Sequence, residues 1–468
     1  MKLDNSLKFT FLIGLVVVFL VALGFLPRIA VIPLTILFSL FVLSKSLEDS
    51  VILFTAFIPF FIAIPITDVF DSFNMWRIVA GLIFLKWFFT KRPRLELKSV
   101  LPVLLVLLLL IAVISIGVSH DKFIAIKRVI YFINLSFVPV VAADLIGRNR
   151  KMVRPLLQAM IVPAFIVMFI GFNQLISTYI TDAGSFHSFW AEQIQFSFYG
   201  SEWSNIALNQ GNTWFAYYGN QLTLRMFSVF PDSHSFPIFL LLAIPAMYAL
   251  RFNKKVLAIV LLAVILSGTR GVWLAMVAPV FVSLFFFRRI KLAPHFLIFI
   301  LLFGVAYPLF ASPQFNIDNS DLLRARLRSI IDFAETSNSG RIHIWKESLK
   351  SVVKNPIIGV GIGNFPIVLD EDINYIRAGS SAHNIYLNVA VELGIVALIF
   401  FLYSLYLIFR KIYVLMDNKD ELINRYSVAA FMYFIWVFTY FMTDVTLFDE
   451  RIFLLFGMNL AIIYALEN

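Results

Sequence analysis

Apolar residues in this chain form long, nearly unbroken runs that short polar segments separate. A helix needs about 20 mostly apolar residues to cross a bilayer, and only helices or closed barrels satisfy the backbone there. Runs near that length lie at roughly 8–27, 28–44, 50–66, 76–91, 99–118, 123–146, 154–177, 234–250, 255–269, 271–287, 292–311, 385–409, 426–443 and 451–466. The pattern predicts an all-α polytopic membrane protein with about 12–14 transmembrane helices.

Basic residues predict the sidedness of these helices, because cytoplasmic loops carry an excess of lysine and arginine. With a cytoplasmic N-terminus, the clusters that begin at Lys91, Arg148, Arg251, Arg288 and Arg410 all fall on the inner side. We therefore expect transmembrane helices in 1–177, an external aromatic loop at 178–233, further transmembrane helices in 234–311, a second external loop at 312–384, and C-terminal transmembrane helices in 385–468.

The amino-acid composition excludes several classes of protein. The chain is 60% hydrophobic and 14% charged, far below the charge of a soluble domain. It has no cysteine, which excludes disulfides and thiolate metal sites. Its net charge of +10 is divided among loop clusters, so we expect contact with membrane lipids and no nucleic acid. Asp370, Glu371 and Asp372 would lie outside, away from cytoplasmic sugar nucleotides, so we expect no metal and no cofactor.

The first external loop is crowded with aromatic residues. They are Phe186, Phe189, Trp190, Phe196, Phe198, Tyr199, Trp203, Trp214, Phe215, Tyr217 and Tyr218. Two interpretations stay open. The rings form an interfacial belt on a helix along the membrane, or they form a surface on which sugar rings stack.

Two arginines stand where apolar runs meet this outer side. Arg225 lies in an apolar stretch, with no carboxylate within one helical turn. Arg270 lies in Ser-Gly-Thr-Arg-Gly, a sequence that favours a tight turn. A charge near the bilayer is costly unless something satisfies it, and a guanidinium fork suits a phosphate or pyrophosphate. The alternative is that both arginines reach lipid headgroups.

The second external loop offers further candidates. Arg326 lies in a basic amphipathic stretch that we expect on lipid headgroups, and Arg341 lies in the first turn of a helix capped by Ser339. Three glycines at 359–363 favour close backbone approach. His383, next to Asn384, precedes a long apolar helix, and histidine is the side chain best suited to move protons near neutral pH. His234 is a weaker rival.

Several of these segments resemble the O-antigen ligase and polymerase superfamily. HNIYLNVAVELGIVA is similar to its H-N-x-Y-L…E-x-G-x-x-G signature, with Ala397 in place of the last glycine. RIHIWKESLKSVVKNPIIGVGIGNF, SGTRG and RMFSVFPDSHSF resemble three further segments, with departures at Ser228 and at Ser233–His234. The matches follow the family's order and cover roughly 225–410.

The resemblance implies a GT-C-like, metal-independent, inverting glycosyltransferase at the external face of the bacterial inner membrane. Its donor would be a glycan on undecaprenyl pyrophosphate, and its acceptor a lipid, such as lipid A-core, or a glycan. His383 would be catalytic, Arg225 and Arg270 would bind the pyrophosphate, and Arg341, Arg326, Asn384 and His234 are supporting candidates; the loop 312–384 would be catalytic. The alternative is a repeat-unit polymerase. A transporter or flippase is remote, because few polar residues interrupt the spans.

Overall fold

A computed structural model describes residues 5–66, 73–91, 100–210, 214–218, 221–285, 298–304, 306, 314, 336–369 and 381–466. Within these ranges, five helical segments are long and apolar enough to cross a membrane. They are α1 (Asn5–Ala22), α6 (Lys122–Arg148), the segment Arg150–Ser177 that contains α7 (Val153–Ser177), α18 (Ile385–Leu415) and α19 (Glu421–Tyr440). The protein is an all-α polytopic membrane protein, which confirms the prediction.

Shorter helices occupy most of the other expected spans. These are α2 (Val31–Ser44), α3 (Leu47–Phe57), α4 (Met75–Lys91), α5 (Val100–Ser115), α11 (Ser235–Ala249), α12 (Lys254–Leu266), α13 (Arg270–Ala275), α14 (Val277–Phe285) and α20 (Glu450–Ala465). Of the expected span 292–311, the structure describes 298–304 and 306, all helical. Apolar length alone therefore located the helices.

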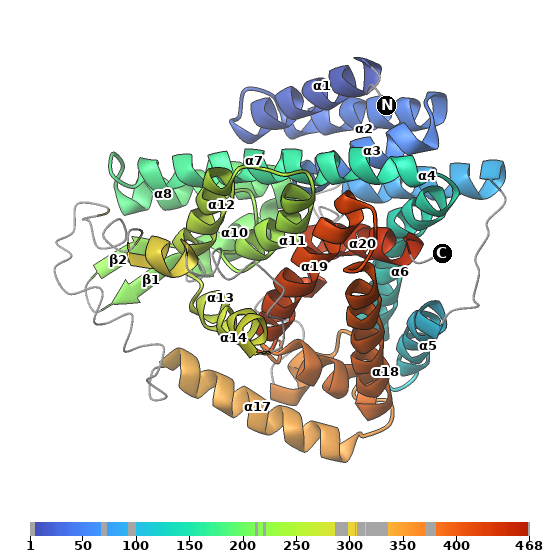
Figure 1. Ribbon diagram of the computed structural model, residues 1–468. Coiled ribbons are helices and arrows are strands. Elements are labelled where there is room, and N and C mark those ends of the chain that lie inside the picture. Colours follow the sequence, from blue (N-terminus) through green and yellow to red (C-terminus); the bar gives the residue numbers. More distant parts are fainter. Residues whose placement is uncertain are drawn as a thin grey trace.

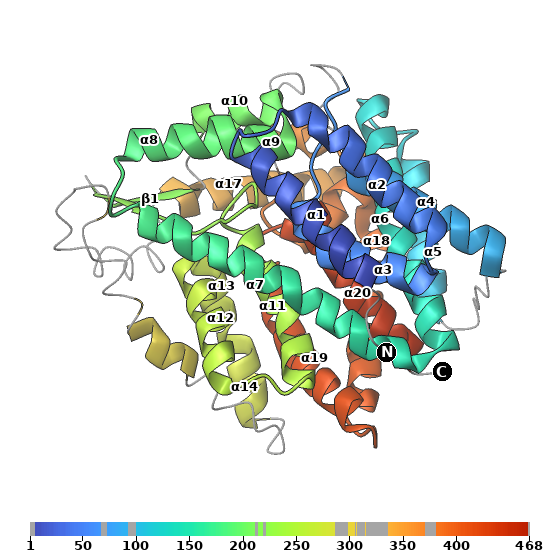
Figure 2. The same ribbon diagram turned by 90° about the horizontal axis from the view of Figure 1, so that it is seen from above.

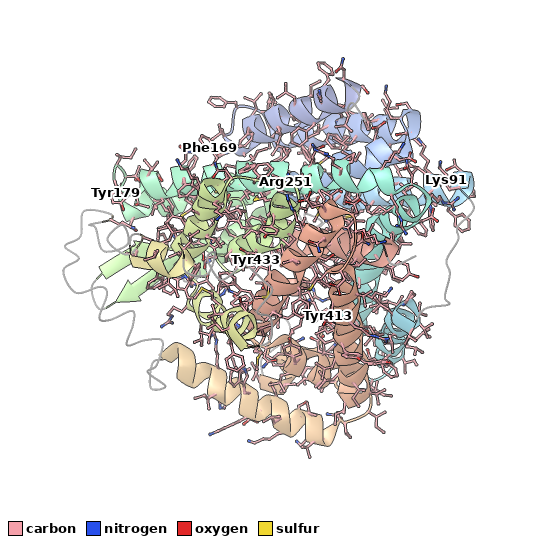
Figure 3. The ribbon with its side chains drawn as sticks, viewed as in Figure 1. Lys91, Phe169, Tyr179, Arg251, Tyr413 and Tyr433 are labelled. Atoms are coloured by element: carbon pink, nitrogen blue, oxygen red, sulfur yellow. The ribbon has the colours of Figure 1, made fainter. Side chains whose placement is uncertain are left out.

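Helix α11 lies at the centre of the molecule (Figure 1) and packs against α7, α12, α19 and α20. Nearly all its residues are buried, because a helix that is apolar all round belongs in a core. The outer surface of the bundle is apolar as well. Phe169 and Tyr413 point outward, whereas Tyr433 is buried among the helices (Figure 3). An apolar exterior is expected where lipid surrounds the protein.

The first long loop contains α8 (Ala183–Ser188), a π-helix (Phe189–Gln195), α9 (Phe196–Tyr199), α10 (Ser201–Gln210), and a hairpin of β1 (Phe215–Tyr218) and β2 (Gln221–Leu224). In the second, α17 (Thr336–Lys354) crosses one end of the molecule, as Figures 1 and 2 show. Helix α17 begins at Thr336, so the expectation that Ser339 caps it is wrong. Lys91, at the end of α4, and Tyr179, just after α7, lie at opposite edges of the molecule in the view of Figure 3.

Helix α18, which covers the span predicted at 385–409, is bent at Gly394, where φ is +86°. The segment after α17 fits into this bend. A Cβ on Gly394 would lie 2.2 Å from the Ile357 carbonyl oxygen, and one on Gly359 would lie 2.4 Å from the Val391 carbonyl oxygen. The Ile395 N–H donates to the Pro356 carbonyl at 2.7 Å. The close backbone approach predicted for the glycine run is confirmed.

Changing Gly359 to Ala is expected to destabilise the protein, because φ is +71° there and the added methyl group would meet backbone atoms. The conformational penalty alone is about 1–3 kcal/mol. Thermal unfolding in detergent should show a lower Tm. Gly81→Ala is the matched control, since its Cβ would meet nothing within 4 Å and a helix interior favours Ala over Gly. Equal Tm values for the two variants would contradict a close backbone approach at Gly359.

Candidate active site

The two predicted arginine segments lie side by side. The Thr269 hydroxyl donates to the Ser233 carbonyl at 2.8 Å, and the Met226 N–H donates to the Leu266 carbonyl at 3.2 Å. Gly268 has φ +65°, and a Cβ there would lie 3.0 Å from Cγ of Arg225. Glycine is therefore required in this turn for Arg225 to pass beside it. The structure thus brings together the segments of Arg225 and Arg270, which α11 and α12 separate in the sequence.

The aromatic loop holds the Arg225 segment in place. The Arg225 N–H donates to the Trp214 carbonyl at 2.8 Å, and the Trp214 ring stacks on Phe227 with centroids 4.5 Å apart. The Trp214 indole N–H donates to the Pro231 carbonyl at 2.9 Å. The amide oxygen of Gln174, on α7, accepts from the backbone N–H groups of Phe227 and Ser228, both at 3.0 Å. Contacts from the aromatic loop and from α7 therefore fix the backbone of residues 225–231.

For five of the rings in the aromatic loop, both predicted roles, an interfacial belt and a sugar-stacking surface, are wrong. Phe186, Trp190, Phe198, Trp214 and Phe215 are buried, so they can neither stack on sugars nor form an interfacial belt. Aromatic side chains bury large areas and stabilise such small assemblies of short helices. The crowding in sequence therefore reflects a local core. Of Tyr217 and Tyr218 the structure describes the backbone only.

His234 is the direct partner of Arg225. Its Nε2 lies 3.4 Å from Nη2 of Arg225, and since a guanidinium only donates, Nε2 accepts and the proton sits on Nδ1. Nδ1 lies 2.7 Å from the Tyr440 hydroxyl and 3.2 Å from Oδ2 of Asp444. Burial, and then the charges of Arg225 and Arg341, lower the pKa of His234 well below its usual value. A neutral histidine therefore connects Arg225 to the end of α19.

Asp232 fixes the backbone around this histidine. Its Oδ1 accepts from the N–H groups of His234 at 2.8 Å and Ser235 at 2.7 Å, at the start of α11. Burial raises the pKa of Asp232 and of Asp444. The sequence reasoning missed Asp232, Tyr440 and Asp444. A signal existed for Asp444, because this carboxylate directly follows the apolar run 426–443 on the predicted outer side.

His383 lies in a constrained turn before α18. Its φ is +45°, a left-handed value that is uncommon for a residue other than glycine. The indole N–H of Trp345 donates to the Ala382 carbonyl at 2.9 Å, and the amide oxygen of Asn388 accepts from the Ala382 N–H at 3.1 Å. Asn384 caps α18 by accepting from the Leu387 N–H at 3.0 Å, which gives it a structural position. These contacts hold the His383 backbone from three sides.

The electrostatics of this turn keep His383 neutral. Burial, and then the nearby charge of Arg341, lower the pKa of His383 to about 4. Arg341 also affects the pKa values of His234 and Asp444, so it lies within electrostatic reach of both histidines. The Ile385 N–H donates to the Phe441 carbonyl at 2.9 Å, which joins the His383 turn to the end of α19.

The arrangement therefore gathers two neutral imidazoles and three guanidinium groups, those of Arg225, Arg270 and Arg341, around the end of α19. Such a set can bind an anion through the cations and accept a proton at a neutral imidazole. Arg326 and the acidic residues 370–372 lie outside the described residues.

Comparison with known proteins agrees with this site. Residues 256–402 match the model of a family described as O-antigen ligase. No curated protein matches the chain significantly. The matched segment contains Arg270, Arg341 and His383, whereas Arg225 and His234 precede it and reach the site through the fold. Over these residues, about a third of its length, the chain is similar to O-antigen ligases.

Proposed function

We propose that this chain is a ligase of the O-antigen ligase and polymerase superfamily, since residues 256–402 of this multi-pass membrane protein match a family described as O-antigen ligase. It transfers a glycan from undecaprenyl pyrophosphate to an acceptor hydroxyl, such as one on lipid A-core, at the outer face of the bacterial inner membrane. The observation that carries the proposal is the convergence of a neutral His383 with Arg225, Arg270 and Arg341.

The proposed reaction needs only what these residues supply. The acceptor hydroxyl loses its proton to the imidazole of His383 as its oxygen attacks the anomeric carbon. The bond from that carbon to the pyrophosphate oxygen breaks, and lipid pyrophosphate leaves from the opposite face, so the configuration inverts. Arg225 and Arg270 stabilise the negative charge that develops on the leaving group. His234 and Asp444 hold Arg225 in position for this role.

A repeat-unit polymerase would use the same donor chemistry with a second lipid-linked glycan as acceptor. Purified protein in nanodiscs should therefore be given lipid-linked repeat units with and without a lipid A-core acceptor, and the products weighed by mass spectrometry. We expect glycan on the lipid acceptor, and no longer glycan when the acceptor is left out. A ladder of glycans from donor alone would contradict the ligase proposal in favour of the polymerase.

A further inference from the structure

Helix α17 is packed against the His383 turn near Arg341 and exposed further along. Trp345 lies toward that turn and donates its indole N–H to the Ala382 carbonyl. One and two turns later, Leu349 and Val353 are 57% and 80% exposed. Their four-residue spacing places both side chains in one stripe of the helix. Just past the helix end, Ile357 is 68% exposed and continues this apolar stripe.

The stripe continues the apolar exterior of the membrane helices. Pro356 and Ile357 lie against the bend of α18, directly before Ile395 and Ile399, which are exposed. Toward α5, a shallow cavity of about 420 Å³ lies between the segment Asn355–Val360 and Val118, which follows the exposed Ile114. Since the exposed residues of α5 and α18 face lipid, the stripe on α17 forms the outer edge of the same apolar surface.

A row of lysines borders the stripe. Lys346, Lys350 and Lys354 are exposed and follow one another at four-residue spacing. Glu347 is the acidic residue of α17, and it pairs with Lys350 at 2.7 Å. Phosphate groups of lipid headgroups lie where an apolar surface gives way to water, and lysines near a helix face reach them while their stems cover apolar surface. The row therefore has the charge that complements an anionic leaflet.

We propose that α17 is an interfacial helix that docks on the outer leaflet of the membrane that the chain spans. Leu349, Val353 and Ile357 enter the boundary of the acyl chains, and Lys346, Lys350 and Lys354 bind the phosphate oxygens of anionic phospholipids. The attraction between these lysines and an anionic surface is electrostatic, so salt weakens it. One turn before Leu349, Trp345 of the same helix holds the His383 turn, so docking on the leaflet would also fix the helix that contacts the candidate active site.

The chain has no cysteine, so a single introduced cysteine can carry an environment-sensitive fluorophore. Val353→Cys and Leu349→Cys report on the stripe, and His343→Cys, at an exposed position on the polar edge of α17, is the matched control. The labelled full-length protein is placed in nanodiscs of phosphatidylglycerol or of phosphatidylcholine, each with and without a lipid that carries a quencher near its headgroup.

We expect blue-shifted emission and strong lipid quenching at both stripe positions, and weaker quenching at 343, which lies in line with the lysine row. Quenching should be at least about twofold stronger in phosphatidylglycerol. Changing Lys346, Lys350 and Lys354 together to Gln should reduce it to the phosphatidylcholine level. Water-like emission at both stripe positions would overturn the proposal, as would a blue shift without lipid quenching, which indicates a protein partner, or quenching independent of lipid charge. These outcomes need no glycan transfer, so they stand apart from the proposed function.

Discussion

His383→Ala is expected to abolish glycan transfer while the protein still inserts and binds donor. A positioned general base contributes about 10²–10⁴-fold to a reaction, and His383 is the neutral imidazole at the boundary of α18. The rate of product formation from saturating donor should fall by that factor. Donor affinity, measured separately by ligand-induced change in Tm, should stay close to that of the unchanged protein.

A second variant separates base chemistry from backbone shape. Because φ is +45° at this position, Ala alone could disturb the turn, whereas Asn tolerates left-handed values. His383→Asn should therefore fold like the unchanged protein and still fail to transfer glycan. His343→Ala, which changes an exposed histidine on α17, should keep full activity. Turnover retained in His383→Asn would rule out the assignment of the base.

The assignment of His383 as the general base also predicts how activity depends on pH. An imidazole accepts a proton only in its neutral form, and the pKa of His383 is lowered to about 4. Activity should therefore persist through mildly acidic pH, and kcat/KM should fall as the pH decreases through about 4. An unperturbed histidine would lose activity near pH 6.5 instead. A profile of kcat/KM against pH distinguishes the two.

The spans and the candidate cations could be predicted because each depends on residues close in sequence. Apolar length defined the helices, and Arg225, Arg270 and His383 stand at the ends of apolar runs. The partners of His234 could not be predicted in this way. Tyr440 and Asp444 lie some two hundred residues away, and only the packing of α11 against α19 brings them to the imidazole.

Burial was the second property that local reasoning missed. Trp214 and Trp190 are equally compatible with a sugar surface, a membrane belt or a core when only their spacing is known. Their contacts with Phe227 decide for the core, because those contacts come from a segment beyond the hairpin. The bend at Gly394 likewise depends on Ile357, which approaches from the segment after α17. Both features arise from tertiary contact.

Arg270→Ala is expected to weaken donor binding. Arg270 begins α13, and the neighbouring turn is tied to the Arg225 segment through Thr269 and Ser233. A hydrogen bond to a charged group contributes about 1.5–3 kcal/mol, so the Kd for a lipid pyrophosphate should rise by roughly 10–100-fold. The measurement is displacement of a fluorescent lipid pyrophosphate from the protein in nanodiscs.

Two further variants show whether the guanidinium itself matters. Arg270→Lys keeps the charge but loses the planar fork, so it should recover only part of the affinity. Arg251→Ala removes an exposed arginine that pairs with Glu421, at the start of the predicted cytoplasmic cluster, and should leave the Kd unchanged. If Arg270→Ala binds donor as tightly as Arg251→Ala, Arg270 does not bind the pyrophosphate. The charge on the leaving group would then have to be stabilised by Arg225 and Arg341, whose charges both act on His234.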